Sequence, residues 1–313
     1  MRTSFFDTLT ALAVDDERIF LLTGDLGFGS IESFARRCPT RFINVGVAEQ
    51  NMIGVATGLA LSGKIVFAYS IANFATLRGL EQIRSGPCYH NASVKVVSSG
   101  TGISYGPLGA SHHATEDIAV MRSLPNMTVV APADPAETCL ATAALVAQGG
   151  PAYLRLGRAN EPAVHTGPID FRLGRAIQVR SGRDLTLIST GGMLSTAVQV
   201  ADTLAGDGLS CRTLNMHTLR PLDRDAVHSA AAETRLIVTI EEHSIVGGLG
   251  GAVAEVLAEL ESPRARLKRI GLPSEFAPHA GSRDYLARHY GLAADQIAAA
   301  IRAMLQPSVV RSA

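Results

Sequence analysis

Short runs of β-branched and other apolar residues alternate with stretches of helical period along the first half of this chain of 313 residues. The runs expected to form strands are residues 19–22, 65–69, 94–98, 128–131 and 152–156. The stretches expected to form helices are residues 4–14, 49–61, 74–84, 116–124 and 135–148. Strands that alternate with helices favour a parallel sheet covered on both faces, because the crossover helices must pack there. We therefore expect an α/β fold for this half.

A second α/β pattern follows residues 157–174, a stretch rich in glycine, proline and polar residues that is typical of a linker. Its expected strands are residues 184–190, 211–214, 235–240 and 267–271. Its expected helices are residues 194–205, a segment from the glycine cluster at 247–251 to residue 260, and residues 293–304. The chain is also long for one hydrophobic core. We expect two domains, residues 1–165 and 175–313, each a mostly parallel sheet flanked by helices.

The composition excludes several classes of function. The chain is 47% hydrophobic and 18% charged, with 28 basic and 28 acidic residues and no formal net charge. Because the basic residues are spread along the chain, we expect no nucleic-acid partner. No apolar run approaches the roughly 20 residues that span a bilayer, so we expect no membrane segment. Charged residues interrupt positions 1–22, which argues against a signal peptide.

The cysteines indicate the compartment. They lie far apart, without the spacing of metal ligands, at Cys38, Cys88, Cys139 and Cys211. Such a pattern is typical of reduced thiols. We expect a cytoplasmic protein.

Glu49 stands where an apolar run, residues 42–47, breaks at Gly46 and gives way to a helical segment. The positive end of a helix favours a carboxylate in the first turn. Taken alone, Glu49 could therefore cap its own helix or take part in chemistry. Gly54 and Gly58 lie on one face of the same segment, and each costs roughly 1 kcal/mol relative to alanine. They predict that another backbone approaches this face closely.

Three other segments carry residues whose role is open on sequence alone. The turn around Asp25 is rich in glycine but fits neither a dinucleotide-binding loop nor a Walker loop. Phe74 opens a helix and could be a core residue or a platform for a cofactor. His112, which is followed by His113, could be an exposed loop residue, a metal ligand or a catalytic group.

Taken in register, these segments resemble the pyrimidine-binding half of transketolase-type thiamine diphosphate enzymes, and the resemblance covers nearly the whole chain. Its most specific part is Gly-Val-Ala-Glu49 followed by a glycine-rich helix. The resemblance implies a pyrimidine-binding domain and a transketolase C-terminal domain. It implies that Glu49 hydrogen-bonds the aminopyrimidine ring nitrogen and stabilises the imino tautomer. It places Phe74 and Ile71 against that ring and Asp25 near the cofactor, which carries a two-carbon ketol unit.

A partner subunit is implied by a motif that this chain lacks. Enzymes of this family hold the diphosphate and its Mg²⁺ with Gly-Asp-Gly followed at a distance by Asn. The one Gly-Asp-Gly here, residues 206–208, follows a helix and has Asn215 close behind it, so we interpret it as a helix-ending turn. The resemblance therefore implies no metal ligand in this chain, an N-terminal transketolase subunit carrying Gly-Asp-Gly and Asn, and an α2β2 heterotetramer.

The expected substrate loop departs from the transketolase pattern. The resemblance places Ser111 and His112 at the substrate, where His112 would assist proton transfers, and places Arg158 where the family binds the substrate phosphate. Leu108 stands where the family has an aspartate that reads a sugar hydroxyl, and Gly100 stands where sugar-phosphate enzymes tend to have a histidine. We therefore expect a sugar or ketose-like substrate other than the ordinary pentose phosphates. The donor and the acceptor are not readable from this chain.

Other functions fit the same half-enzyme. One is the β subunit of a 2-oxoacid dehydrogenase decarboxylase component, which hands an acyl group to a lipoyl domain. Another is a biosynthetic enzyme that passes a two-carbon unit to a carrier protein. A third is a non-catalytic structural subunit, although the presence of Glu49 argues against it. Residues 241–243, with the glycine cluster after them, resemble a segment that the family uses mainly for dimer packing.

Overall fold

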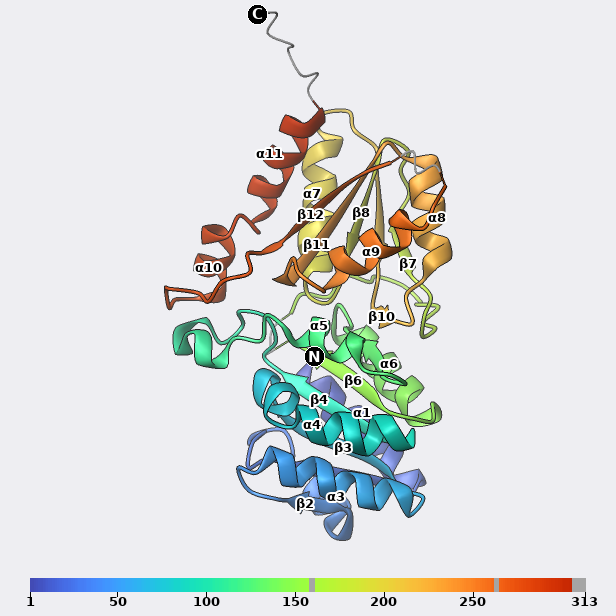
Figure 1. Ribbon diagram of the computed structural model, residues 1–313, viewed down its shortest axis with the longest axis vertical. Helices are drawn as coiled ribbons and strands as arrows, with labels where there is room; N and C mark the ends of the chain where they lie inside the picture. The colour runs from blue at the N-terminus through green and yellow to red at the C-terminus, as the bar shows by residue number, and fades with distance from the viewer. Residues whose placement is uncertain (158–160, 262–264, 306–313) are drawn as a thin grey trace, which may run out of the picture.

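A computed structural model describes residues 1–157, 161–261 and 265–305. Within these ranges the chain forms two α/β units stacked end to end, which are the lower and upper lobes in Figure 1. No helix in the described part is long and apolar enough to cross a membrane.

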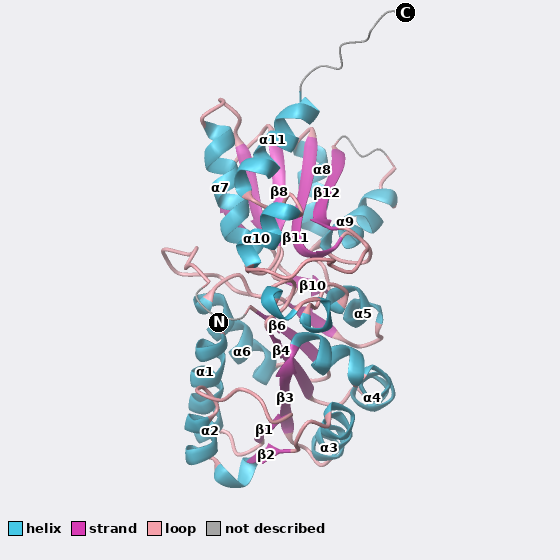
Figure 2. Cartoon of the chain, turned by 90° about the vertical axis from the view of Figure 1, so that its left-hand side faces the viewer, coloured by secondary structure: helices cyan, strands magenta, loops and turns pink. Residues whose placement is uncertain are grey.

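The first unit is built on a seven-stranded sheet with the order β10-β5-β6-β4-β3-β1-β2. Its strands from the first half of the chain are β1 (Ile19–Thr23), β2 (Phe42–Asn44), β3 (Ile65–Ile71), β4 (Val94–Ser99), β5 (Thr128–Val130) and β6 (Ala152–Leu156). The helices α1 (Arg2–Asp15), α2 (Glu32–Arg37) and α6 (Pro135–Ala147) cover one face. The helices α3 (Glu49–Leu61), α4 (Leu80–Ile83) and α5 (Asp117–Ser123) cover the other face (Figure 2).

The second unit is built on a five-stranded sheet with the order β12-β11-β8-β9-β7. Its strands are β7 (Ile177–Arg180), β8 (Leu185–Ser189), β9 (Cys211–Asn215), β11 (Leu236–Ser244) and β12 (Arg266–Leu272). Its helices are α7 (Met193–Ala205), α8 (Arg224–Glu233), α9 (Leu249–Ala258), α10 (Arg283–His289) and α11 (Ala294–Leu305). In this sheet only the β7–β9 pair is antiparallel. The expected fold class, two mostly parallel sheets flanked by helices, is confirmed.

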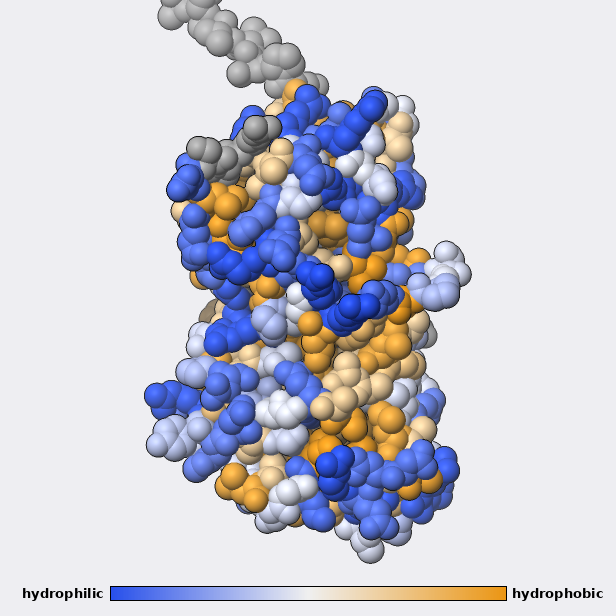
Figure 3. All heavy atoms as spheres, turned by 90° about the vertical axis from the view of Figure 1, so that its right-hand side faces the viewer, coloured by the Kyte–Doolittle hydropathy of each residue, from blue (hydrophilic) through white to orange (hydrophobic). Residues whose placement is uncertain are grey.

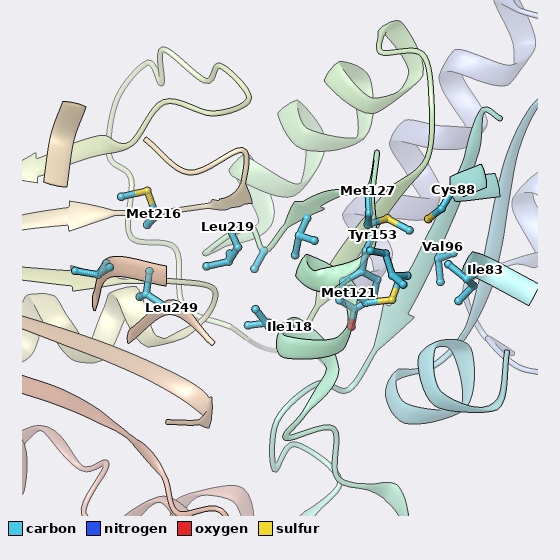
Figure 4. Packing of buried hydrophobic residues seen from close by; sticks show 14 of the residues in the cluster. Ile83, Cys88, Val96, Ile118, Met121, Met127, Tyr153, Met216, Leu219 and Leu249 are labelled. Carbon is cyan, nitrogen blue, oxygen red and sulfur yellow. The ribbon is translucent and has the colours of Figure 1, made fainter. Parts of the chain in front are cut away.

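The two units share a strand and a core. Strand β10 (Thr218–Arg220) comes from the second half of the chain, but it pairs antiparallel with β5 and extends the first sheet. One buried apolar cluster continues across the junction, where Met216 and Leu219 from the second half and Ile118 and Met121 from the first belong to it (Figure 4). Apolar burial therefore fixes the two lobes to each other.

A buried ionic group also crosses the junction. Arg155 on β6 donates from Nε to Asp117 Oδ2 at 2.7 Å and from Nη2 to the carbonyl of Glu242 at 3.1 Å. Only 6% of the Arg155 side chain and 1% of the Asp117 side chain are exposed. Burial raises the pKa of Asp117, but the Arg155 charge and hydrogen bonds outweigh it, so the pKa lies below its usual value. Arg155 is therefore a buried, paired residue and not a solvated charge at the end of its strand.

The side chains of residues 241–243 are buried. Glu241 Oε2 accepts a hydrogen bond from the backbone of Leu249 at 2.7 Å, and Glu242 Oε1 accepts one from the backbone of Ile103 at 2.9 Å. His243 is fully buried beside Asp117. The resemblance suggested dimer packing for these side chains, but their contacts join segments of the same chain.

The segment predicted as one helix over residues 74–84 is divided. It begins with a π-helical turn, Phe74–Arg78, continues as α4 and ends in a second π-helical turn, Arg84–Cys88. Pro87 lies in the second turn, and a proline has no N–H for the regular helical bond. Such π turns occur frequently at functional sites.

Candidate functional site

Glu49 is buried at the carboxyl edge of the first sheet. Gly46, with φ of 75°, turns the chain between β2 and α3, so that Glu49 lies in the first helical turn. Only 3% of the residue is exposed. Ser70 Oγ donates to Oε1 at 2.9 Å, and Arg78 Nη1 donates to Oε2 at 3.2 Å. The carboxylate thus bonds side chains from β3 and from the following π turn, and it does not cap its own helix.

Arg78 bonds Glu49 and also covers the ring of Phe74. The guanidinium carbon of Arg78 lies 3.7 Å from the centroid of that ring. The π turn brings both residues to the same side, because it begins at Phe74 and ends at Arg78. A flat group that donates hydrogen bonds therefore fits between the face of Phe74 and the carboxylate of Glu49.

His112 lies close to Phe74. The centroids of the two rings are 5.3 Å apart, and the rings meet edge to face. Ser111 Oγ and His112 Nδ1 are hydrogen-bonded at 3.0 Å, and Asn73 Nδ2 donates to the carbonyl of Ser111 at 2.6 Å. The structure therefore brings Glu49, Phe74 and His112 into one neighbourhood, and Asn73 fixes the loop that carries His112.

Asp25 and Ile71 border this neighbourhood. Asp25 is exposed, has φ of 60° and accepts from Asn44 Nδ2 at 2.9 Å. The preceding Gly24 lies close to the carboxylate, since a Cβ there would be 3.4 Å from Glu49 Oε1. Ile71 is partly buried at the end of β3. Arg158 lies outside the described residues.

The two departures in the substrate loop occupy different surroundings. Leu108 is 53% exposed, so it projects from the surface of this chain. Gly100 follows β4 and is covered by the ring of Tyr105.

The contacts match one part of thiamine diphosphate. Arg78 places a planar hydrogen-bond donor between a ring face and a buried carboxylate, and the aminopyrimidine is also a planar group that forms hydrogen bonds. The diphosphate needs a metal, yet residues 1–157, 161–261 and 265–305 contain no group of three or more His, Cys, Asp or Glu that could hold one.

Three residues of this neighbourhood were not identified from the sequence: Ser70, Arg78 and Tyr105. Ser70 could have been identified as a candidate, because it is a polar residue near the end of an otherwise apolar strand. Arg78 could also have been identified, because it follows Phe74 at a helical spacing of four. Tyr105 could not, since its position depends on how a long loop folds back over Gly100.

The glycines of α3 do not meet another part of this chain. Apart from its chain neighbours and the backbone of its own helix, a Cβ added at Gly54 or Gly58 would have no described atom within 4 Å, and both residues are exposed. The predicted close approach of a backbone is therefore wrong for contacts within the chain. This face of α3 is open.

Comparisons with known proteins agree with this architecture. Residues 1–163 match the family described as transketolase, pyrimidine binding domain, and residues 174–297 match transketolase, C-terminal domain. The chain is 40% identical over 298 residues to a 6-deoxy-6-sulfo-D-fructose transketolase subunit of a Clostridium species, covering 95% of this chain and 92% of the relative. It is also 40% identical to an apulose-4-phosphate transketolase subunit of Phocaeicola vulgatus, covering 93% of each.

A solved structure has the same fold. It is a split-gene transketolase described as an inactive β4 tetramer, with 39% sequence identity and a TM-score of 0.89. The match covers 97% of both chains.

Proposed function

The chain belongs to the transketolase family, and we propose that it is the C-terminal subunit of a two-component, thiamine diphosphate-dependent enzyme that transfers a two-carbon ketol unit. The observation that carries the proposal is the buried carboxylate of Glu49 beside the ring of Phe74. Burying a carboxylate is costly unless its oxygens are hydrogen-bonded, and here each oxygen has a donor. A buried carboxylate held in place by two donors is well suited to act on a ligand.

The proposed roles follow from the contacts. Glu49 holds a proton between its carboxylate and the ring nitrogen of the aminopyrimidine, while Phe74 and Ile71 orient the ring and Asp25 borders it. When bound, thiamine diphosphate supplies the nucleophilic carbon that takes up the ketol unit. His112 moves protons to and from the substrate oxygens, and its bond to Ser111 orients the imidazole. Arg158 is proposed as an anion contact for the substrate.

The diphosphate and Mg²⁺ are assigned to an N-terminal partner subunit in an α2β2 heterotetramer. The open face of α3 supports this assignment, because the cost of Gly54 and Gly58 in a helix is unexplained within the chain. Val47, just before α3, is 71% exposed, and Leu61 at its end is 58% exposed. Figure 3 also shows apolar surface gathered on the lower lobe and at the waist between the lobes. Large exposed apolar areas are typical of interaction sites.

The substrate is proposed to be a ketose outside the ordinary pentose phosphates. Relatives named for sulfofructose and for apulose 4-phosphate show that such substrates occur among similar subunits. We also propose that the chain divides into two domains, residues 1–165 and 175–313. The proposed location is the cytoplasm.

The test is to co-express the chain with an N-terminal transketolase subunit and to measure ketol transfer from hydroxypyruvate to a panel of aldoses. We expect turnover that requires thiamine diphosphate, Mg²⁺ and both subunits. If the assembled pair binds the cofactor but transfers no ketol unit from any donor, the proposed reaction is wrong.

A further inference from the structure

Gly100 and Tyr105 fit together in a way that admits no side chain at position 100. A Cβ built on Gly100 would lie 1.9 Å from Tyr105 Cε2 and 2.5 Å from Cδ2, far inside van der Waals contact. Gly100 also has φ of 78°, which side-chain-bearing residues rarely adopt. The aromatic ring therefore lies directly on the backbone at the end of β4.

The loop that carries Tyr105 is anchored on both sides of the ring. Before it, the backbone N–H of Ile103 donates to Glu242 Oε1 at 2.9 Å. After it, the carbonyl of Gly106 accepts from Gly281 at 3.3 Å, and a Cβ on Gly106 would lie 2.3 Å from the Gly281 carbonyl. Because both anchors are in the second unit, the ring is held in place by the packing of the two lobes.

Tyr105 extends the row of rings that starts next to Glu49. The centroid of its ring lies 6.3 Å from that of His112, which in turn lies 5.3 Å from that of Phe74. A substrate whose reacting carbonyl lies at the Phe74 end would pass His112 and present its remote end to Tyr105. The inference thus rests on the function proposed above.

Three described donors at the end of β4, beside Tyr105, are already paired. The backbone N–H groups of Gly100 and Thr101 both donate to the carbonyl of Leu156, at 3.0 Å and 3.4 Å. The hydroxyl of Thr101 donates to the same carbonyl at 3.2 Å. The face of an aromatic ring is negative, so it repels an anion laid against it.

Two described cations near this loop are already paired. Arg155 bonds Asp117, and Arg283 Nε donates to Glu242 Oε2 at 2.7 Å. A phosphate pressed against Tyr105 would lose water without gaining a partner from these groups.

We propose that Tyr105 helps to select the substrate: a remote end that lies against its ring is favoured when it carries a hydroxyl or an alkyl group rather than a phosphate, so the anion contact proposed for Arg158 would serve a different part of the substrate. Gly100 acts with it as a positioning residue, because only glycine leaves room for the ring.

The experiment compares xylulose with xylulose 5-phosphate, which differ only in the remote group, on the assembled two-subunit complex. Dissociation constants are measured by calorimetry with an unreactive thiamine diphosphate analogue, and kcat/KM is measured with the active cofactor. We expect the wild type to prefer xylulose. For each quantity, the ratio of the value for xylulose to the value for xylulose 5-phosphate measures the preference. Tyr105→Ala should shift both ratios toward the phosphate by at least about tenfold. Tyr105→Phe should leave them unchanged, because the ring remains.

Gly100→Ala is the second variant, since its new Cβ forces the ring aside and should reproduce the shift. The Tm of each variant shows whether it folds. If Tyr105→Ala weakens both sugars equally, or if the wild type prefers the phosphate, the inference is overturned. Turnover of hydroxypyruvate, which lacks the remote end of a sugar, tests ketol transfer separately. If Tyr105→Ala shifts the ratio of the two dissociation constants but the complex does not turn over hydroxypyruvate, the role of Tyr105 is supported and the proposed reaction is wrong.

Discussion

The guanidinium of Arg78 joins Phe74 to Glu49: its carbon lies 3.7 Å from the ring centroid, and Nη1 lies 3.2 Å from Glu49 Oε2. In this arrangement one cation occupies both contacts that the aminopyrimidine of the proposed cofactor would use. A second flat group cannot lie on the same face of Phe74 while Arg78 remains there. Arg78 must therefore move when the ring binds, or the ring must take another side of Phe74.

Arg78→Ala should strengthen the binding of thiamine diphosphate to the assembled complex. The cation–π contact contributes about 0.5–1 kcal/mol at a half-exposed site, so its loss should lower the Kd two- to fivefold. Calorimetry on the complex measures this. Arg84→Ala is the matched control, because Arg84 is exposed in the next turn. Weaker binding in Arg78→Ala alone would mean that Arg78 helps to hold the cofactor.

Glu49→Gln should reduce kcat by at least roughly 10²-fold, since the amide cannot exchange a proton with the ring nitrogen. Assembly should persist, because the amide has nearly the same shape. Steady-state kinetics and size-exclusion chromatography of the reconstituted pair test both points. Glu81→Gln, an exposed substitution in α4, should have no effect. Near-normal turnover in Glu49→Gln would show that another acid exchanges the proton with the ring nitrogen.

The isolated chain should not bind thiamine diphosphate tightly, because its described residues offer no metal site for the diphosphate. Calorimetric titration with the cofactor and Mg²⁺ should show tight binding only after the partner subunit is added. Micromolar affinity in the chain alone would contradict the two-component assignment.

Asp117→Asn should lower the free energy of unfolding by about 3–5 kcal/mol, because it leaves the buried charge of Arg155 without its counter-charge. Urea denaturation provides the measurement. Asp295→Asn is the control: Asp295 pairs with Arg288, both side chains are more than half exposed, and such pairs contribute little. Equal effects of the two substitutions would show that the Asp117–Arg155 pair is not important for stability.

Lys95 should make stability depend on pH above neutrality. Burial lowers the pKa of this lysine to about 7, from 10.5 in the unfolded chain. The unfolded chain therefore binds more protons between these values, and the free energy of unfolding should rise with pH by about 1.4 kcal/mol per unit. Lys95→Met should lack this rise. Denaturation of both proteins at pH 7 and 9 tests it, and parallel behaviour would contradict it.

Much of the fold was predictable because strands such as β3 and β6 are mostly apolar runs with glycine or polar residues near their ends. Strand β10 was not, since three residues carry too little pattern and their pairing with β5 depends on contacts distant in sequence. The division of residues 74–84 was also missed, because apolar periodicity does not distinguish a π turn from an α turn.

The candidate site was predictable to the extent that single motifs fall at strand ends. Glu49, Phe74 and His112 were singled out and lie together, because the carboxyl ends of neighbouring parallel strands share one edge. The pairing of Arg78 with Glu49 and the packing of Tyr105 on Gly100 depend on side-chain geometry, which no spacing in the sequence encodes.

The place of β10 limits how such genes can be recombined. In this chain, Thr218 and Arg220 of β10 pair with Val130 and Val129 of β5. In a chimera joined within the linker, β10 would instead have to pair with the edge strand of a different protein's sheet. A second half that is missing would leave that edge unpaired and open to association with other chains. A successful exchange between relatives must therefore move β5 and β10 together, although 87 residues separate the end of one from the start of the other, from Val130 to Thr218.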